Sequence, residues 1–208
     1  EPVGLLRITA PQSLGRIIIA PHLNSFLKLY PHIRIDMILD DTFTDLVGEG
    51  IDLAFRIGTL PDSSMMAKRM GETRRSLWAS PAYLSEFGTP DHPHDLADHE
   101  ALLYRQLANN PLWTFENGKD AAEVKVDGRF QASSGDVLVE AAIENLGILL
   151  SPDWLVTAKV KNGELVRVLP GWFAPPVIIH CVWTSGKLKG KAKLFAEHMA
   201  DALKFVEG

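Results

Sequence analysis

Alternating apolar and polar residues near the start of the chain predict a strand that runs directly into a helix. Residues 5–10 alternate with a period of two and are rich in β-favouring side chains. Pro11 cannot donate to a strand ladder, so the strand is expected to end there. Ser13 is a good N-cap for a helix that starts at Leu14. Strand-to-helix turns of this kind are where open α/β sheets bind ligands.

The same alternation of strand and helix patterns continues through the first third of the chain. We expect a helix over 14–30, strands over 33–39 and 52–57, and between them a short helix capped by Thr42. Pro21 either kinks the first helix or marks where regular helix begins. The order β-α-β-α-β is typical of a parallel sheet with right-handed crossovers.

The pattern changes after residue 64 to a mixture of short strands and helices. We expect strands over 65–70, 76–79, 101–104, 113–115, 124–130, 148–150, 165–169 and 177–183. Asn117-Gly118 is the turn signal between 113–115 and 124–130, which are expected to pair in antiparallel fashion. A short helix is expected to start over 80–84 and to stop at Gly88, and further helices are expected over 137–144, 152–159 and 192–205. Residues 89–99 are expected to be a loop.

Composition narrows the class of protein. The 208 residues allow one large domain or two small ones, and 46% hydrophobic with 23% charged residues is ordinary for a globular chain. A net charge of −5 argues against a chain that by itself grips a phosphate backbone. Cys181 is the only cysteine, lies in a buried-strand pattern and is expected to be an inert core thiol.

Neither a membrane span nor a leader is expected from the pattern. The apolar runs are too short to cross a bilayer, and residues 1–4 do not resemble a signal peptide. The chain begins without Met, so we expect it to be either processed or part of a longer protein.

Several motifs, in their order and spacing, resemble the effector-binding domain of LysR-type transcriptional regulators. Leu-Arg-Ile-Thr-Ala-Pro is followed by a helix ending in Tyr-Pro and by Asp-Leu-Ala-Phe-Arg-Ile-Gly. Ile-Leu-Leu-Ser-Pro-Asp-Trp-Leu-Val precedes Gly-Glu-Leu-Val-Arg-Val-Leu-Pro, and Ala-Ser-Pro-Ala-Tyr-Leu is similar to the CrgA-like branch. The resemblance covers essentially the whole chain.

The resemblance implies a periplasmic-binding-protein type II fold, an α/β fold of two Rossmann-like subdomains joined by two crossover strands. Residues 1–70 with 180–208 would form regulatory subdomain I, and residues 71–179 would form subdomain II. In this family a small effector binds in the cleft between the subdomains. The family's winged helix-turn-helix is missing from this chain, whose first residues match the point just after the linker helix.

The resemblance also implies partners and a location. We expect a cytoplasmic regulator without a cofactor that forms a homodimer or tetramer and reaches DNA only through the missing winged helix-turn-helix. In the family the first-lobe helix, here within residues 16–30, packs against a partner. Ile17, Ile19 and Leu29 look surplus to a single apolar stripe, as expected of a contact surface.

The resemblance places the effector at six residues of this sequence: Gln12, Ser13, Arg56, Thr59, Ser133 and Ser134. Elementary chemistry is consistent with this, because helix N-termini offer N–H groups to anions and an arginine can pair with a carboxylate. The effector would then be small and polar or anionic. Alternatively, Arg56 forms a structural salt bridge and Ser13 and Ser133 only cap helices. If Arg56 binds the effector, Arg56→Ala should weaken binding with little loss of stability.

Enzyme and metal hypotheses have weaker support. We find no Gly-x-Ser-x-Gly elbow, no His-Glu-x-x-His motif and no P-loop, since residues 186–191 miss its spacing. His92, His94 and His99 lie among aspartates, and a solvated loop explains them better than a metal site. The alternatives to a regulator are a free-standing solute-binding protein of the same fold and a small α/β enzyme.

Overall fold

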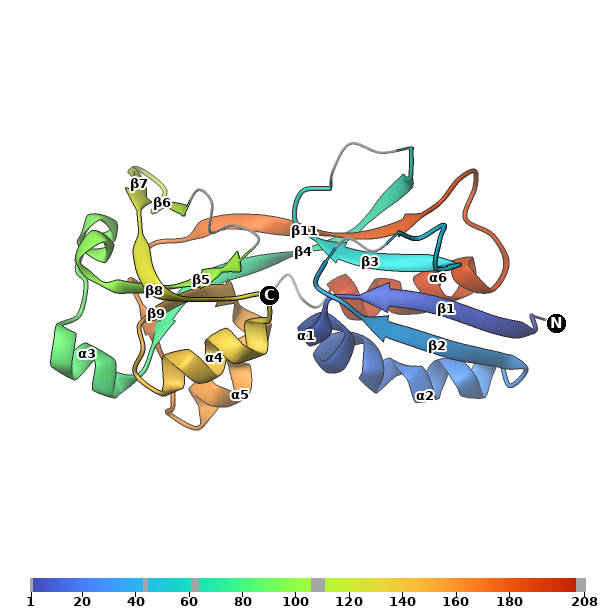
Figure 1. The fold of residues 1–208 in the computed structure, drawn as a ribbon, viewed down its shortest axis with the longest axis horizontal. Helices are drawn as coiled ribbons and strands as arrows, with labels where there is room; N and C mark the ends of the chain where they lie inside the picture. The colour runs from blue at the N-terminus through green and yellow to red at the C-terminus, as the bar shows by residue number, and fades with distance from the viewer. Residues whose placement is uncertain (1, 43–44, 61–63, 106–110, 205–208) are drawn as a thin grey trace. The chain divides into compact units, whose positions relative to one another are not determined.

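The computed structural model describes residues 2–42, 45–60, 64–105 and 111–204 (Figure 1). The chain forms two compact units: unit 1 comprises residues 1–73 and 177–208, and unit 2 comprises residues 74–176. Strands β4 (Met66–Ala79) and β11 (Ala174–Trp183) each contribute residues to both units. Among the described residues, no helix is both long enough and apolar enough to cross a membrane.

Unit 1 is built on the parallel sheet that the sequence pattern predicts. Strand β1 (Gly4–Ala10) lies between β2 (Ile33–Leu39) and β3 (Leu53–Ile57) and pairs in parallel with both. β11 then pairs with β3 in antiparallel fashion, giving the order β2-β1-β3-β11-β4. The three parallel strands confirm the expected α/β class.

Helices cover one face of this sheet. The chain passes from β1 to β2 through α1 (Gln12–Leu14), the π-helical turn η1 (Gly15–Ile19) and α2 (Ala20–Leu29), while α6 spans Gly190–Lys204. Pro21 lies in the first turn of α2, directly after the π-helical turn η1, so it marks where regular α-helix resumes. The rings of Phe26 and Phe55 both pack against Phe195 of α6, with centroids 4.9 and 6.1 Å away.

In unit 2 the sheet order continues from β4 as β4-β9-β5-β8. β5 (Glu100–Tyr104) pairs in parallel with both β8 (Asp127–Ala132) and β9 (Ile148–Pro152). β4 runs antiparallel to both β9 and β10 (Val166–Val168), and β6 (Leu112–Glu116) forms a separate hairpin with β7 (Ala121–Lys125).

Two apolar clusters of unit 2 cover opposite faces of its sheet. α4 (Gly135–Ile143) and α5 (Asp153–Lys161) pack on the face that carries Trp78, Leu102 and Leu149. The other face carries Leu77 and Leu103 and is covered by residues from α3 (Pro81–Phe87), the 3₁₀ helix η2 (Pro93–Asp98) and the β6–β7 hairpin. Such burial on both faces is typical of parallel strands.

The structure corrects several element boundaries. The two strands expected over 65–70 and 76–79 are one strand, β4, which continues through Gly71-Glu72-Thr73. The helix expected after Thr42 is a series of turns over 46–50, and Thr42 donates both its N–H and its hydroxyl to Asp40. The expected strand over 124–130 is divided at Val126 between β7 and β8, which pair with different strands.

Candidate functional site

The carboxyl ends of three parallel strands form one edge of unit 1. Gln12 and Ser13 follow β1, Asp40 and Asp41 follow β2, and Thr59 follows β3. Because β1 is parallel to both neighbours, these residues lie at the same edge. The carboxyl edge is where open α/β sheets bind ligands. We call it the unit 1 edge.

The helix at the unit 1 edge begins two residues earlier than its sequence suggests. Its N-cap is Pro11, and Ser13, only 6% exposed, lies inside the first turn, so the N-cap role expected of Ser13 is wrong. The proline residue fits this position because its ring fixes a φ compatible with entry into a helix. The backbone N–H of Gln12 donates to Asp41 Oδ1 at 3.1 Å.

Arg56 is buried beneath the unit 1 edge. Its side chain is 6% exposed, and Nη1 donates to the carbonyl oxygens of Phe55 and Asp40 at 3.2 and 3.4 Å. Burial lowers the pKa of Arg56, and the nearby carboxylates of Asp40 and Asp41 raise it in opposition. The guanidinium therefore already has hydrogen-bond acceptors and nearby countercharges from its own chain.

Four further polar residues near this edge were not selected from the sequence. Asp40 and Asp41 could have been noticed, because they directly follow a strand expected to be parallel. Thr9 is fully buried, and its hydroxyl has no hydrogen-bond partner among the described residues. His180 of β11 lies opposite Arg56 in the antiparallel β3–β11 pair, a neighbour that only the tertiary structure reveals.

A corresponding edge exists in unit 2. The strands β5, β8 and β9 are parallel, so Tyr104, the start of α4 and the start of α5 lie at the same edge of that sheet. Ser134 is the N-cap residue of α4 but makes no side-chain capping hydrogen bond, and Ser133 is exposed. The indole N–H of Trp154, in the first turn of α5, is buried without a hydrogen-bond partner among the described residues.

The six residues expected at the effector site are thus divided between the two units. Gln12, Ser13, Arg56 and Thr59 lie at the unit 1 edge, where Thr59 is exposed and Arg56 is buried. Ser133 and Ser134 lie at the edge of unit 2, and the N-cap position expected at Ser133 belongs to Ser134.

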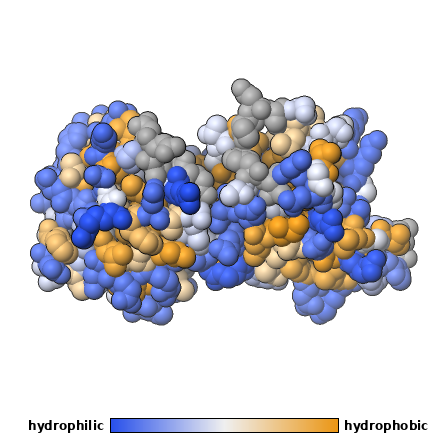
Figure 2. All heavy atoms as spheres, viewed as in Figure 1, coloured by the Kyte–Doolittle hydropathy of each residue, from blue (hydrophilic) through white to orange (hydrophobic). Residues whose placement is uncertain are grey.

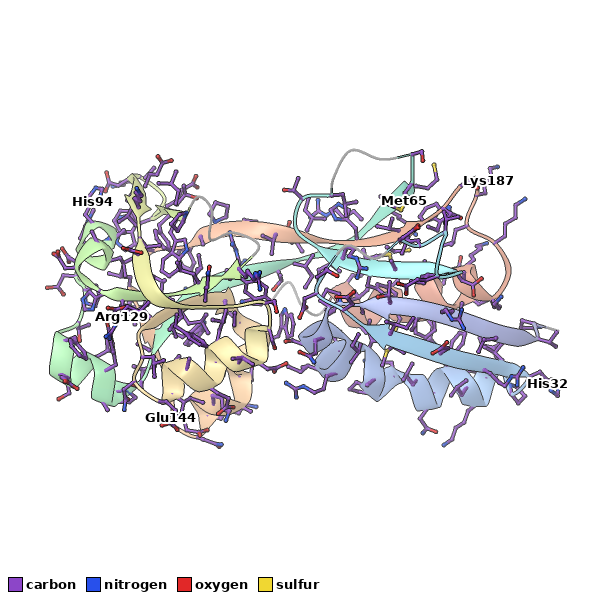
Figure 3. All side chains as sticks on the ribbon, viewed as in Figure 1. His32, Met65, His94, Arg129, Glu144 and Lys187 are labelled. Carbon is purple, nitrogen blue, oxygen red and sulfur yellow. The ribbon has the colours of Figure 1, made fainter. Side chains whose placement is uncertain are left out.

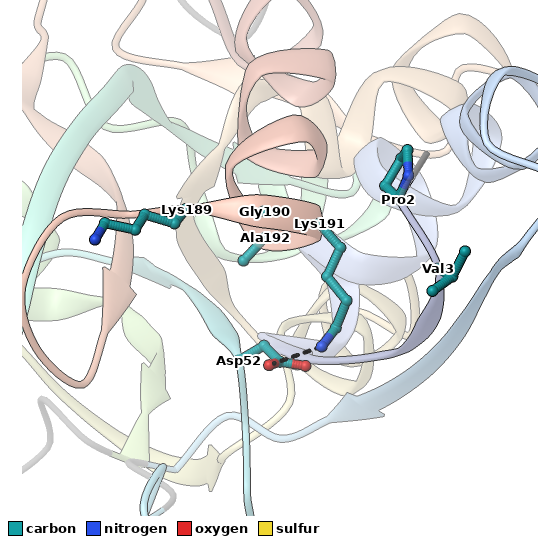
Figure 4. A pocket seen from close by; sticks show the side chains of 7 residues that line it. All are labelled: Pro2, Val3, Asp52, Lys189, Gly190, Lys191 and Ala192. Carbon is teal, nitrogen blue, oxygen red and sulfur yellow. Dashed lines mark ion pairs between the residues drawn. The ribbon is translucent and has the colours of Figure 1, made fainter.

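A hollow of about 360 Å³ lies at the opposite edge of the unit 1 sheet (Figure 4). It is lined by residues that precede β1 and β3 and by the start of α6: Pro2, Val3, Asp52, Lys189, Gly190, Lys191 and Ala192. Lys191 Nζ lies 3.3 Å from Asp52 Oδ1, so the charge of this lysine is compensated. The hollow is therefore distinct from the residues expected to bind an effector.

The histidine-rich segment folds into a structural turn. His92 and Asp95 form a reciprocal capping box at the start of η2, so the expected loop over 89–99 contains a 3₁₀ helix. Two backbone N–H groups, of His92 and Asp91, lower the pKa of Asp95. The exposed side chain of His94 lies at the surface of unit 2 (Figure 3). Within the described part of the chain, no cluster of three or more potential ligands could hold a metal ion.

Comparison with known families identifies the class of protein that this fold defines. Residues 1–204 match the family model described as the LysR substrate binding domain. The chain therefore belongs to the LysR substrate-binding domain family.

Curated relatives place this family within longer transcriptional regulators. The chain is 37% identical over 209 residues to an HTH-type transcriptional regulator of Xanthomonas campestris and 34% identical over 204 residues to PtxR of Pseudomonas aeruginosa. Each alignment covers 98% of this chain, but only 61% and 65% of the relatives. The chain thus spans less than two thirds of the length of these curated relatives.

Solved structures agree with this assignment. The regulatory domain of CrgA from Neisseria meningitidis has a TM-score of 0.85 at 26% identity, covering 97% of this chain and 100% of that domain. Full-length AphB of Vibrio cholerae, described as a virulence activator of the LTTR family, has a TM-score of 0.81 at 33% identity. That match covers 96% of this chain and 69% of AphB. The expected type II periplasmic-binding-protein fold and the likeness to CrgA are confirmed.

Proposed function

We propose that this chain is the effector-sensing part of a LysR-type transcription regulator. Its membership of the LysR substrate-binding family is the observation that carries the proposal. We assign unit 1 to regulatory subdomain I and unit 2 to regulatory subdomain II. In this proposal the chain binds a ligand without transforming it, as its regulator relatives suggest.

The proposed effector is a small polar molecule whose affinity depends on both candidate edges. Gln12, Ser13 and Thr59 would contact it in unit 1, with Arg56 supporting the edge from below, and Ser133 and Ser134 would contact it in unit 2. Backbone N–H groups and hydroxyls suit an effector with carboxylate or other oxygen acceptors. A resident metal or cofactor has no part in this proposal.

A thermal-shift screen of small carboxylates, amides and alcohols tests effector binding. A true effector at about 100 times its dissociation constant should stabilise the chain by roughly 2.7 kcal/mol. The double variant Ser133→Ala, Ser134→Ala should lose most of this stabilisation, whereas Ser185→Ala, an exposed serine of unit 1, should retain it. Turnover of any ligand would contradict a sensing role.

The proposed partners include a second copy of the chain. Hydrophobic surface gathers over β1, β2 and α2 (Figure 2), where the exposed fractions of Leu29 and Leu39 are 64% and 38%. Ile17 is half-buried and Ile19 is fully buried, so Ile19 belongs to the core of its own chain rather than to a contact surface.

Sedimentation should detect a dimer or tetramer of the chain, and Leu29→Glu should weaken this association by placing a charge on the exposed apolar surface. A monomer at high protein concentration would contradict the proposal.

The proposed DNA partner acts through the part of the regulator that lies outside this chain, in the cytoplasm. If the effector prefers one conformation of the full-length protein, then effector and DNA binding are coupled, typically by about 1–3 kcal/mol, and the coupling is reciprocal. Anisotropy titrations of the full-length regulator at fixed salt should show this change. Unchanged affinity and DNA bending with effector bound would contradict the mechanism.

A further inference from the structure

The helix at the unit 1 edge already binds a carboxylate of its own chain. Gln12 begins α1, and its N–H donates to Asp41 Oδ1 at 3.1 Å. The residues that join α1, η1 and α2 have right-handed helical dihedrals, so residues 12–29 form one continuous helical segment. The N-terminus of such a segment attracts anions through its N–H groups and its dipole. Asp41 supplies that anion.

The charges beneath this contact make the edge unfavourable for a second anion. Asp40 and Asp41 both act on Arg56, whose guanidinium is buried. Arg56, Asp40 and Asp41 together carry one positive and two negative charges, so their net charge is negative. A free carboxylate that arrives while Asp41 is in place therefore meets an occupied donor and a net negative charge.

A buried hydroxyl beneath the same edge also lacks a partner. Thr9 lies opposite Ala54 in the β1–β3 pair, so its side chain is on the face of the sheet that also carries Arg56. The Thr9 hydroxyl is fully buried and has no hydrogen-bond partner in the described ranges. Buried polar groups are normally hydrogen-bonded, and a bound ligand or water would supply the missing partner of the Thr9 hydroxyl.

We propose that Asp41 is a specificity-determining residue of the effector site, because its carboxylate occupies the position that the effector's own carboxylate takes. The inference rests on the proposed function. An effector must exchange one charged hydrogen bond for another at the Gln12 N–H, and Asp41 must withdraw. Neutral acceptors compete poorly, since hydrogen bonds to charged acceptors are roughly twice as strong as neutral ones. The exchange thus selects carboxylates and sets the concentration at which the domain responds.

The experiment compares the 208-residue chain with Asp41→Asn and Asp41→Ala. Asn keeps an acceptor for the helix but removes the charge, and Ala removes both. The control is Asp91→Asn, the same change of charge at an exposed residue of unit 2. Acetate, succinate and benzoate are titrated in parallel with acetamide, succinamide and benzamide, and the amide resonance of Gln12 is followed by NMR.

Loss of the competing charge should tighten carboxylate binding about tenfold in Asp41→Asn, the fold-change that corresponds to one charged hydrogen bond. The amides should gain less, Asp91→Asn should bind like the parent chain, and the Gln12 resonance should move during the carboxylate titration. Equal or weaker carboxylate binding by Asp41→Asn overturns the proposal, as does binding that leaves the Gln12 resonance in place.

The outcomes separate this proposal from the proposed function. If the parent chain binds a carboxylate but Asp41→Asn and Asp41→Ala bind it no better, the sensing role survives and the role of Asp41 fails. If only neutral molecules bind, the carboxylate class fails and the sensing role again survives. If neither these probes nor the wider screen yields a ligand, both proposals fail together.

Discussion

The buried guanidinium of Arg56 joins the ends of two strands in unit 1, since it donates to backbone carbonyls of Phe55 and Asp40. Arg56→Ala should therefore lower the free energy of unfolding by about 1.5–3 kcal/mol, the usual contribution of hydrogen bonds to a charged group. Urea unfolding measures this loss. The sequence alone led to the expectation that removing Arg56 would cost little stability, and the burial of Arg56 argues against it.

Arg129 provides the matched control for this variant. Its side chain is 87% exposed and pairs with Glu100 at 3.0 Å, so Arg129→Ala should cost no more than about 1 kcal/mol. Equal losses for the two variants would show that burial gives Arg56 no special structural role.

His180 should make the stability of the chain depend on pH. Burial, followed by the positive charge of Arg69, lowers the pKa of His180 below its ordinary value of 6.5, although the backbone at Gly58 acts in the opposite direction. Between the lowered pKa and 6.5 the unfolded chain binds a proton that the folded chain does not, so stability falls as the pH decreases through this window.

Urea midpoints measured from pH 8 to pH 5 test the role of His180. Burial also lowers the pKa of His99, so the parent chain should lose stability through both residues. His180→Gln should reduce the slope without removing it, whereas Ser185→Ala, at an exposed position without a titratable group, should leave it unchanged. An identical slope in His180→Gln and the parent would contradict the lowered pKa.

At the scale of elements, Gly128 allows β8 to pair with β5. The register of this pair shifts between Glu100 and Leu102, and a Cβ at position 128 would overlap the carbonyl group of Ala101. Gly128→Ala should therefore destabilise unit 2 by about 1–3 kcal/mol or more, because the β5 backbone must move. Gly171→Ala, where a Cβ meets nothing within 4 Å, should change stability by at most about 0.5 kcal/mol in the same urea titration.

Local sequence patterns predicted most elements but failed where distant pairing decided the outcome. The strands of the first parallel sheet were predicted because alternation and helix stops agree along the chain. Gly71-Glu72-Thr73 has the composition of a turn, yet β4 continues through it as the neighbour of β11 in the sheet, and the later residues 75–79 of β4 pair with β9 and β10. Propensity is a weak guide when partners on both sides fix a strand.

The candidate site was predictable in position but only partly in chemistry. The strand-to-helix turn predicted after residue 10 places Gln12 and Ser13 at a sheet edge, as the structure has them, because the carboxyl ends of parallel strands are a property of topology. Ser134 was placed at the start of a helix by the family resemblance, and it is the N-cap residue of α4. The hydrogen bond from the Gln12 N–H to Asp41 and the burial of Arg56 both depend on residues that are far apart in the sequence. Such contacts have no local signal in a single sequence.

For the whole molecule, charge predicts weak interaction with DNA. The chain has 21 basic and 26 acidic residues, and two of its four clustered lysines are paired within unit 1: Lys191 with Asp52 and Lys193 with Glu197. The chain alone should therefore bind duplex DNA no more tightly than non-specific binders, with Kd of about 10⁻⁴–10⁻⁶ M at physiological salt. Anisotropy with the target promoter fragment measures this. Tight, sequence-specific binding by residues 1–208 would contradict the proposal that the regulator binds DNA through the part outside this chain.

The order of the units along the chain has a consequence for biosynthesis. Unit 2 is one continuous stretch, residues 74–176, whereas unit 1 needs residues from both sides of it. During translation unit 2 can fold as soon as it leaves the ribosome, but Phe26 and Phe55 must wait for Phe195 of α6. At a synthesis rate of about 5–20 residues per second, the apolar face of the nascent β1–β2–β3 sheet remains without that helix for roughly 7 to 30 seconds. In that interval chaperones have their greatest opportunity to bind this chain.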